Sequence, residues 1–269
     1  MGSSRLVRAC DLSAYVGPDG LRFWHGGGEL GLPDLCFLRS LGQGTYEQLT
    51  ARAAILKAME SAGSLVLNPT SALEKVRDKF STLIALKQAG FLVPRTYLTE
   101  SSSVAYTACG SIRRFVYKPL IGSLGFGSML FDDRDLAYNI LRLLERHGCP
   151  LHIQEFVEDA VRELRVFLIS GEIVACAEKM PEPGAWKRNV AQGARMVEAE
   201  PPPGLEELCS RVSESLGLFY AGLDVIEVED GGLVALEVNG APNWRGLQEA
   251  TGVDIAELLV GEAVELLRS

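Results

Sequence analysis

AGLDVIEVEDGGLVALEVNG, residues 221–240, consists of two apolar stretches separated by a turn sequence. The pair Asp230-Gly231 is typical of two-residue type I′ turns, so the segment predicts a β-hairpin. With that turn, Asp224 in the first strand lies directly opposite Glu237 in the second. Like charges that face each other across a sheet are unfavourable by roughly 0.2–1 kcal/mol unless a positive group lies between them. The hairpin therefore predicts either a bound cation or a solvated strand face.

The predicted carboxylate face of this hairpin is only partly polar. Strand side chains alternate between two faces, so Asn239 lies on the same face as Glu237, and Leu236 lies on the other. Ile226 and Ala235 share the carboxylate face. Two carboxylates and an amide oxygen among apolar neighbours suit a hard divalent cation such as Mg²⁺. We interpret this face as a candidate metal site, with a solvated outer face as the alternative.

The first part of the chain alternates strand and helix patterns. An apolar run at 33–42 is followed by helical spacing at 45–63 and a strand pattern at 64–70. Residues 71–90 predict a second helix that begins with a capping box. Such alternation indicates a small parallel α/β unit that extends to about residue 75.

The pattern changes toward antiparallel strands after residue 90. The expected strands lie at 115–120, 128–133 and 151–157, with a hairpin at 164–180, helices at 134–148 and 204–217 and from 254, and an irregular proline-rich stretch at 181–204. We therefore expect a fold that combines α/β and α+β architecture.

A glycine-rich stretch, YKPLIGSLGFGSM at 117–129, follows one of the predicted strands. Backbone N–H groups of such a loop can bind phosphates, although no Walker A lysine follows it. Lys118 lies in the apolar strand just before the loop, and burying an ammonium group without an anion is costly. A lysine that extends to water at the strand edge is the alternative. The candidate phosphate-binding residues of the loop are Gly122, Ser123, Gly125 and Gly127.

Composition and charge argue against several classes of function. The chain has 269 residues, of which 47% are apolar, and a formal net charge of −9. This charge opposes attraction to nucleic acid or to an anionic membrane. No stretch reaches the roughly 18 apolar residues of a membrane span, and the six cysteines are scattered. We therefore expect a cytoplasmic protein with no nucleic-acid or membrane partner.

The ordered motifs resemble the ATP-grasp fold, and more narrowly the RimK-like carboxylate–amine ligases. The resemblance runs from about residue 44 to the C-terminus and rests on GTYEQLTARAAIL, LNPTSALEKVRDKFSTLIALKQAGFLVPRT, YKPLIGSLGFGS, IQEFV, ELRVFLISGEIVA, WKRNVAQGA, AGLDVI, LEVNGAPNWRGL and TGVDIAELL. The first half looks most like the α-L-glutamate ligases that modify cofactors such as tetrahydromethanopterin. The resemblance implies an α/β domain at 1–75, an ATP-grasp lid subdomain at 76–157 and a C-terminal ATP-grasp subdomain at 158–269, the last two enclosing ATP.

The resemblance also implies a role for each candidate site residue. ATP would be bound by Lys79, Lys118, Gly122, Ser123, Gly125, Gly127, Gln154, Glu155, Phe156, Val157 and Glu163. Mg²⁺ or Mn²⁺ would be bound by Asp224, Glu237 and Asn239. The transferred group would be stabilised by Arg165, Lys187, Arg188 and Asn189. The helical pattern around Lys79 by itself predicts only a solvated lysine on an amphipathic helix.

The reaction implied by the resemblance joins a carboxylate to an amine through an acylphosphate, with ATP converted to ADP. The expected substrates are a small-molecule carboxylate and an amino acid, with glutamate favoured, and a homo-oligomer is possible. Modification of a protein or peptide terminus and an inactive ATP-binding scaffold are the alternatives. The sequence departs from the family pattern at Glu163, where Asp is common, and at 186–194, where relatives often have Arg-x-Asn followed by His-Arg-Gly-Gly. Trp244 would either stack on a substrate ring or pack in the core.

Overall fold

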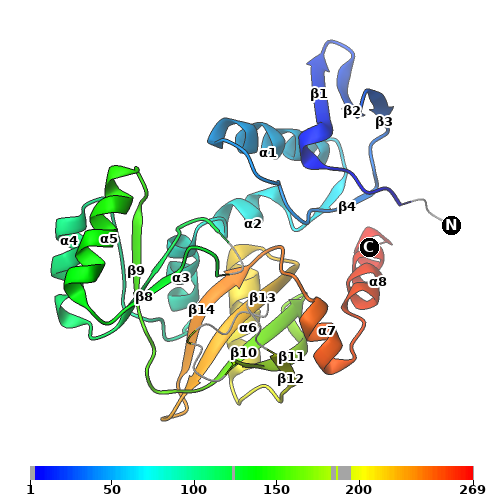
Figure 1. The fold of residues 1–269 in the computed structure, drawn as a ribbon. Helices are drawn as coiled ribbons and strands as arrows, with labels where there is room; N and C mark the ends of the chain where they lie inside the picture. Colours follow the sequence, from blue (N-terminus) through cyan, green and yellow to red (C-terminus); the bar gives the residue numbers. More distant parts are fainter. Residues whose placement is uncertain (1–3, 123–124, 183–185, 187–194, 269) are drawn as a thin grey trace.

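The computed structural model describes residues 4–122, 125–182, 186 and 195–268. Figure 1 shows three groups of elements: an N-terminal group with α1, a group with α4 and α5, and a third group around a five-stranded sheet. Two short 3₁₀ helices, η1 (Ala9–Asp11) and η2 (Cys109–Ser111), complete the secondary structure that these ranges contain. The candidate site lies where the second and third groups meet.

The N-terminal group contains one expected and one unexpected sheet. Strands β4 (Leu35–Phe37) and β5 (Leu65–Leu67) pair in parallel, and α1 (Tyr46–Ser61) lies between them in the sequence. This arrangement confirms the predicted parallel α/β unit. An antiparallel three-stranded sheet, which was not expected from the sequence, precedes them. Its strands are β1 (Leu12–Gly17), β2 (Gly20–His25) and β3 (Gly28–Leu30).

The helix expected at 71–90 was wrong in one respect, because it is two helices. These are α2 (Thr70–Lys75) and α3 (Lys79–Gln88). Asp78 begins α3 as its N-cap, accepting a hydrogen bond from the Ser81 backbone at 2.8 Å. The expected capping box is also wrong, because the Glu74 side chain pairs with Lys57 at 2.7 Å.

The second group is an antiparallel sheet in the order β6-β9-β7-β8. It contains β6 (Thr96–Thr99), β7 (Phe115–Lys118), β8 (Met129–Phe131) and β9 (Leu151–Glu155). Helices α4 (Ser102–Ala108) and α5 (Arg134–Arg146) cover one face, where Leu151 and Ile153 are fully buried. The alternate residues of β9, His152 and Gln154, therefore lie on the other face.

The third group is an antiparallel sheet in the order β12-β11-β10-β13-β14. Its strands are β10 (Ala160–Ile169), β11 (Glu172–Met180), β12 (Arg195–Glu198), β13 (Tyr220–Val228) and β14 (Leu233–Asn239). The expected hairpin at 164–180 corresponds to β10 and β11 and is confirmed. Strand β12 lies within the stretch that was expected to be irregular throughout, so that expectation was wrong at 195–198.

The two faces of the five-stranded sheet differ in what covers them. Helices α3 and α6 (Leu205–Leu216) pack on one face in a continuous apolar core. Helices α7 (Arg245–Thr251) and α8 (Ile255–Arg268) pack on one end of the other face, around Phe167 and Tyr220. The remainder of that second face carries polar side chains of β10, β11, β13 and β14.

The turn of the β13–β14 hairpin is longer than expected. Val228 pairs with Gly232 across a three-residue loop in which Gly231 has φ +82°, so the predicted two-residue turn was wrong. Glu227 then pairs with Leu233, one residue out of the expected register. A β-bulge restores the expected register. Asp224 pairs with Glu237 and the next residue, Val225, pairs with Ala235, so Leu236 of β14 is an extra residue between these two pairs.

This β-bulge preserves the predicted carboxylate pair and changes its neighbours. Asp224 pairs with Glu237 as predicted. Leu236, expected on the opposite face, lines the cavity beside Glu237. Ala235, expected on the carboxylate face, is instead fully buried in the core under α3 and α6. The extra residue Leu236 shifts the alternation, so residues such as Ala235 that precede it in β14 lie on the face opposite to the one expected.

Candidate active site

A cavity of about 640 Å³ lies between the four-stranded and the five-stranded sheets. Its walls come from β7 and β9 on one side and from β10, β11, β13 and β14 on the other. The predicted site residues that line it are Lys79, Lys118, Gly122, Gly125, Gln154, Glu155, Phe156, Val157, Glu163, Arg165, Asp224, Glu237 and Asn239. Residues far apart in sequence thus share one cavity.

The remaining predicted site residues do not line this cavity or are not described. Gly127 is described but is not among the lining residues; its φ is +75°, and a Cβ there would lie 2.9 Å from the Pro119 ring. Gly127 therefore permits the turn of the loop and its close approach to Pro119. Ser123, Lys187, Arg188 and Asn189 lie outside the described residues.

Two lysines lie at the glycine-rich end of the cavity. Lys118, the last residue of β7, donates from Nζ to the Gln154 side-chain oxygen at 2.5 Å. Lys79, the first residue of α3, donates from Nζ to the Gly122 carbonyl at 2.7 Å. Burial lowers the pKa of Lys118, and the nearby carboxylates of Glu237 and Glu163 oppose this effect. Both ammonium groups donate to neutral oxygens, and within the described ranges neither forms an ion pair with a carboxylate, so both can bind an anion that enters the cavity.

The opposite wall contains a buried network of charged side chains. Lys179 of β11 lies 2.8 Å from Glu163 and 2.8 Å from Asp224, and Arg165 lies 2.9 Å from the same Asp224 oxygen. Burial alone would raise the pKa of the Asp224 carboxyl, but Lys179 and Arg165 hold it below its usual range. Lys179 of β11 therefore pairs with Glu163 of the neighbouring β10 and with Asp224 of β13, the strand beyond it.

Lys179 is the functional candidate that the sequence analysis missed. It is 4% exposed and belongs to a strand whose other inward residues include Ala175 and Ala177. A lysine on an apolar strand face needs an anionic partner, which is the argument that singled out Lys118. The partners of Lys179 become visible only when β10 and β13 lie beside β11, because they come from distant parts of the sequence.

The oxygen donors of the candidate metal site fit a hard cation that also binds phosphates. Within the described residues, the side chains of Glu237 and Asn239 have no hydrogen-bond or ion-pair partner, and both line the cavity. No group of three or more His, Cys, Asp or Glu side chains in those residues could hold a metal by itself. Mg²⁺ commonly uses one or two carboxylates and completes its shell with phosphates and water. Asp224, Glu237 and Asn239 match that pattern.

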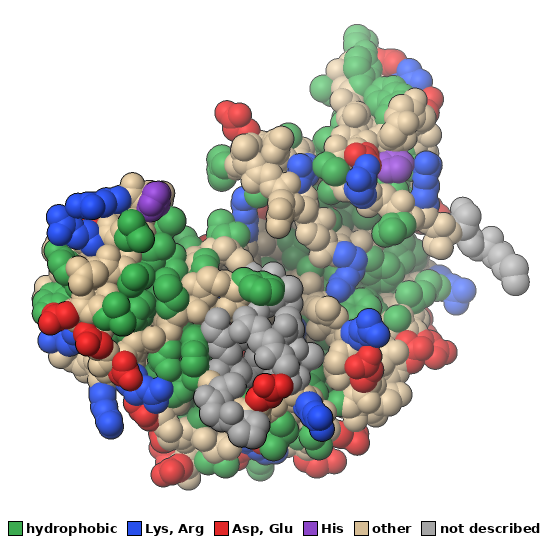
Figure 2. All heavy atoms as spheres, viewed as in Figure 1, with side chains coloured by type: hydrophobic (Ala, Val, Ile, Leu, Met, Phe, Trp, Pro, Cys, Tyr) green, Lys and Arg blue, Asp and Glu red, His purple; other side chains and the backbone are tan. Residues whose placement is uncertain are grey.

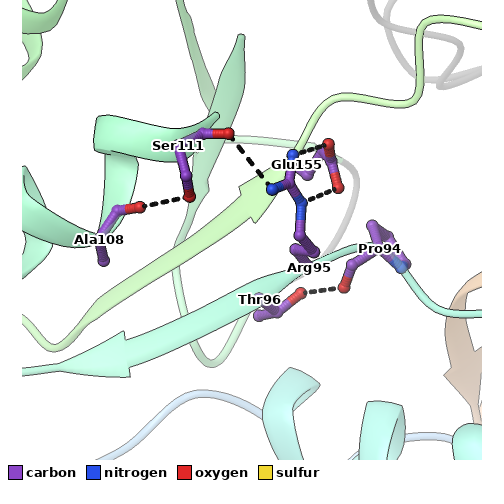
Figure 3. Close-up of polar contacts among 6 residues, drawn as sticks. All are labelled: Pro94, Arg95, Thr96, Ala108, Ser111 and Glu155. Carbon is purple, nitrogen blue, oxygen red and sulfur yellow. Dashed lines mark hydrogen bonds and ion pairs between the residues drawn. The ribbon is translucent and has the colours of Figure 1, made fainter. Parts of the chain in front are cut away.

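The Glu155 carboxylate is already engaged by an arginine. Arg95 donates from Nε and Nη2 to the two carboxylate oxygens of Glu155 at 2.8 and 2.5 Å, as Figure 3 shows at the end of β9. Arg95 also donates to the Ser111 carbonyl at 3.2 Å. The hydrogen bonds from Arg95 lower the pKa of the Glu155 carboxyl. Glu155 therefore borders the cavity with a carboxylate that is not free for a ligand.

The far end of the cavity is formed by the segment that follows β14 and by α7. Arg245 and Glu249 line it and pair with each other at 3.0 Å. Trp244 packs edge-on against Phe167 with 5.6 Å between ring centroids and belongs to the core under α7 and α8. This half-buried packing agrees with the core interpretation of Trp244.

The surface seen in Figure 2 carries basic and acidic side chains intermixed over the same elements. A continuous field of one sign is absent from the described residues of this face. None of the helices in the described residues is long and apolar enough to cross a membrane.

Comparison with known proteins shows similarity to ligases. Residues 76–262 match the family described as RimK-like ATP-grasp domain. The tetrahydromethanopterin:α-L-glutamate ligase of Methanocaldococcus jannaschii is 32% identical over 242 residues, covering 88% of this chain and 81% of that protein. A probable α-L-glutamate ligase of Legionella pneumophila is 29% identical over 212 residues, covering 77% of this chain and 69% of that protein.

A solved structure has the same fold. It is the ATP-grasp ligase PsnB, complexed with a phosphomimetic variant of minimal precursor, Mg and ADP. It superposes with a TM-score of 0.75 and 22% identity, over 95% of this chain and 86% of that chain. The expected ATP-grasp fold is confirmed by this likeness.

Proposed function

The chain belongs to the RimK-like ATP-grasp family of ATP-dependent carboxylate–amine ligases, and from this we propose that it adds glutamate, or another amino acid, to a small-molecule cofactor. A cofactor of the tetrahydromethanopterin type is the favoured acceptor. The similarity to the Methanocaldococcus jannaschii ligase supports both choices, since that protein is 32% identical over most of the chain.

The observation that carries this proposal is the composition of the cavity. Its one wall supplies ammonium groups and glycine backbone, and its other wall supplies carboxylate, amide and guanidinium groups. Phosphoryl transfer from ATP requires positioning and charge neutralisation, and these residue types provide both. A serine or cysteine nucleophile is not needed for this chemistry.

We propose for these residues the roles that the resemblance implies, and the shared cavity supports them. Lys79 and Lys118 bind the phosphates, residues 154–157 border the adenine, and Glu163 lies near the ribose. Mg²⁺, when bound by Asp224, Glu237 and Asn239, neutralises the charge of the transferred phosphoryl group. We also propose the boundaries 1–75, 76–157 and 158–269 for the domain and the two subdomains, with ATP between the last two.

The proposed reaction has two steps, phosphoryl transfer and amide formation. The acceptor carboxylate oxygen attacks the γ-phosphorus of ATP, the bond to the β-phosphate oxygen breaks, and ADP leaves. The amino group of the amino acid attacks the acylphosphate carbonyl, the carbon–oxygen bond breaks, and inorganic phosphate leaves as the amine loses a proton. Arg165, together with Lys187, Arg188 and Asn189, stabilises the acylphosphate and the oxyanion of the second step.

The ion pairs of Lys179 and Arg165 bring two basic side chains to the wall of the cavity. Both groups neutralise Asp224. Guanidinium and ammonium groups form strong charge-assisted hydrogen bonds to phosphate oxygens. Their position beside the proposed metal ligand Asp224 therefore supports a role for both residues in binding the phosphates of the nucleotide.

The test is an assay of products with a panel of acceptors. The protein is incubated with ATP, Mg²⁺, glutamate and candidate pterin carboxylates, and ADP, AMP and phosphate are separated. We expect ADP and phosphate to form in equal amounts, only when an acceptor and Mg²⁺ are present. Formation of AMP, or turnover that does not depend on Mg²⁺, would contradict the proposal.

A peptide or protein terminus is the second candidate acceptor. Its support is the fold shared with PsnB, whose structure contains a minimal precursor variant. Parallel assays with pterin carboxylates and with peptides that end in glutamate separate the two acceptors. An inactive scaffold is distinguished by Glu237→Gln, which removes one metal-binding charge: ADP formation by a ligase falls sharply, whereas a scaffold has no turnover to lose.

A further inference from the structure

Residues from the N-terminal group reach the segment that forms the far end of the cavity. Strands β4 and β5 run in parallel, and the residues that follow them, Arg39 and Asn68, contact the five-stranded sheet. Their targets are the first residues of β13 and the segment 240–244, which directly follows the predicted metal ligand Asn239. Both residues lie outside the part of the chain that matches the family.

Asn68 joins the ends of two adjacent strands. Its side-chain oxygen accepts hydrogen bonds from the backbone amides of Phe219 and Tyr220 at 2.6 and 3.0 Å. Its side-chain nitrogen donates to the carbonyls of Tyr220 and Gly240 at 2.7 and 2.5 Å. Asn68 is fully buried. If its side-chain amide were removed, these four backbone groups would lose their hydrogen-bond partner, and water could not replace it.

Arg39 holds the same segment two residues further along. Its Nη2 donates to the Pro242 carbonyl at 2.5 Å, and its guanidinium lies 4.1 Å from the centre of the Trp244 ring. A second link comes from the Tyr220 hydroxyl, which donates to the Leu38 carbonyl at 3.1 Å. Arg39 itself is exposed, so its removal leaves no buried charge behind.

Close packing leaves this segment little room to move. A Cβ added to Gly240 would lie 2.6 Å from the Leu73 side chain and 2.9 Å from the Val76 side chain. The segment therefore packs against α2 and the residue that follows it on one side, and it is bound by Arg39 and Asn68 on the other. Residues on both of its sides, Asn239 and Arg245, line the cavity.

We infer that Arg39 and Asn68 are positioning residues, which fix the segment 240–244 and so set the place of Asn239 and of the acceptor end of the cavity. The substrate end is then built jointly by the N-terminal group and the C-terminal sheet. The part of this inference that concerns metal and acceptor binding rests on the proposed function; the part that concerns the position of the segment does not.

The test uses Arg39→Ala, because Asn68→Ala would leave buried backbone groups unpaired and endanger folding. The matched control is Arg52→Ala. Arg52, like Arg39, is an arginine that donates to backbone carbonyls, but its acceptors are Leu41 and Gln43 of the N-terminal group, at 2.7 and 2.9 Å, and not the segment 240–244. Arg39→Lys tests whether a shorter cation restores the hydrogen bond to Pro242.

The first measurement is amide hydrogen exchange of peptides that cover 239–247 in the protein without ligands. Arg39→Ala is expected to speed exchange there by about tenfold, the factor that corresponds to 1.4 kcal/mol of lost hydrogen bonding. Arg39→Lys should restore part of the protection, and Arg52→Ala should leave it as in the wild type. Equal exchange in Arg39→Ala and the wild type, or equal effects of Arg39→Ala and Arg52→Ala, would overturn the inference.

The second measurement is calorimetric binding of ADP at increasing Mg²⁺. Arg39→Ala is expected to raise the Mg²⁺ concentration needed for half-maximal ADP affinity by several-fold, with ADP affinity in the absence of Mg²⁺ unchanged. A residue that only stabilises the fold would lower the melting temperature without moving this midpoint. If the midpoint does not move, the link to the metal site is wrong. Failure of the proposed function is separate, because the wild type would then form no ADP in the product assay, whatever happens to this midpoint in Arg39→Ala.

Discussion

Replacement of His152 by phenylalanine should remove a specific pH dependence from the stability of the protein. His152 is fully buried in β9, on the face opposite α4 and α5, and pairs in register with Lys118. Among the described residues, neither ring nitrogen has a hydrogen-bond partner, and the ring meets the Phe80 ring edge-on at 6.5 Å. Its surroundings therefore favour the neutral imidazole.

The size of the effect follows from the pKa of His152. Burial, with smaller contributions from Lys118 and Lys79, lowers this pKa from 6.5 to about 4. As pH falls below 6.5, the unfolded chain binds a proton that the folded chain does not bind until near pH 4, so stability is lost through this window. Between about pH 7.5 and about pH 5 the loss amounts to about 2 kcal/mol, at 1.36 kcal/mol for each unit of pKa difference that is expressed.

The assay is urea unfolding of the wild type and of His152→Phe at these two pH values. The wild type should lose about 2 kcal/mol more unfolding free energy than the variant on acidification. At the higher pH the variant should be as stable or more stable, because phenylalanine leaves no unpaired polar atom. His147→Gln, at an exposed position at the end of α5, controls for the general loss of an imidazole. Identical losses in the wild type and in His152→Phe would refute the reasoning.

Three further substitutions probe the cavity. Gly222→Ala places a Cβ 2.7 Å from an Arg165 guanidinium nitrogen, so ADP formation should fall by about tenfold or more while circular dichroism stays that of the wild type. Lys179→Met leaves Asp224 with one cation fewer and should lower the unfolding free energy by about 3 kcal/mol, with a part recovered when Mg²⁺ is added to the melt. Glu155→Gln removes a carboxylate that an arginine already holds, so the KM for ATP should change less than twofold and the unfolding free energy by less than about 1 kcal/mol.

Local patterns were sufficient to predict the hairpin and its carboxylate pair. Strand periodicity and the Asp230-Gly231 turn indicated that Asp224 faces Glu237, and the structure has this pairing. The predicted pair is correct although the predicted turn is not. The turn contains one residue more than expected, and the β-bulge opposite Asp224 and Val225 shifts the register back by one residue. Sequence periodicity does not reveal a bulge, because a bulge depends on how the neighbouring strands pack.

Contacts between distant elements account for what the sequence analysis missed. Lys179 finds its carboxylates on β10 and β13, and Arg39 finds its carbonyl partner after β14. Neither set of contacts leaves a local signal beyond an unexpected charge, which lies in an apolar strand for Lys179 and just after a short apolar strand for Arg39. The break before α3 is different, since Asp78 is an ordinary N-cap residue and could have been found from sequence.

The acylphosphate route is tested most directly by following oxygen from the acceptor carboxylate into phosphate. The protein is incubated with ATP, Mg²⁺, glutamate and a pterin acceptor whose terminal carboxylate is labelled with oxygen-18, and the inorganic phosphate is analysed by mass spectrometry. The account predicts one labelled oxygen in each phosphate released, in step with ADP and amide formation, and its near loss in Glu237→Gln. Amide formation with unlabelled phosphate, or with AMP in place of ADP, would contradict it.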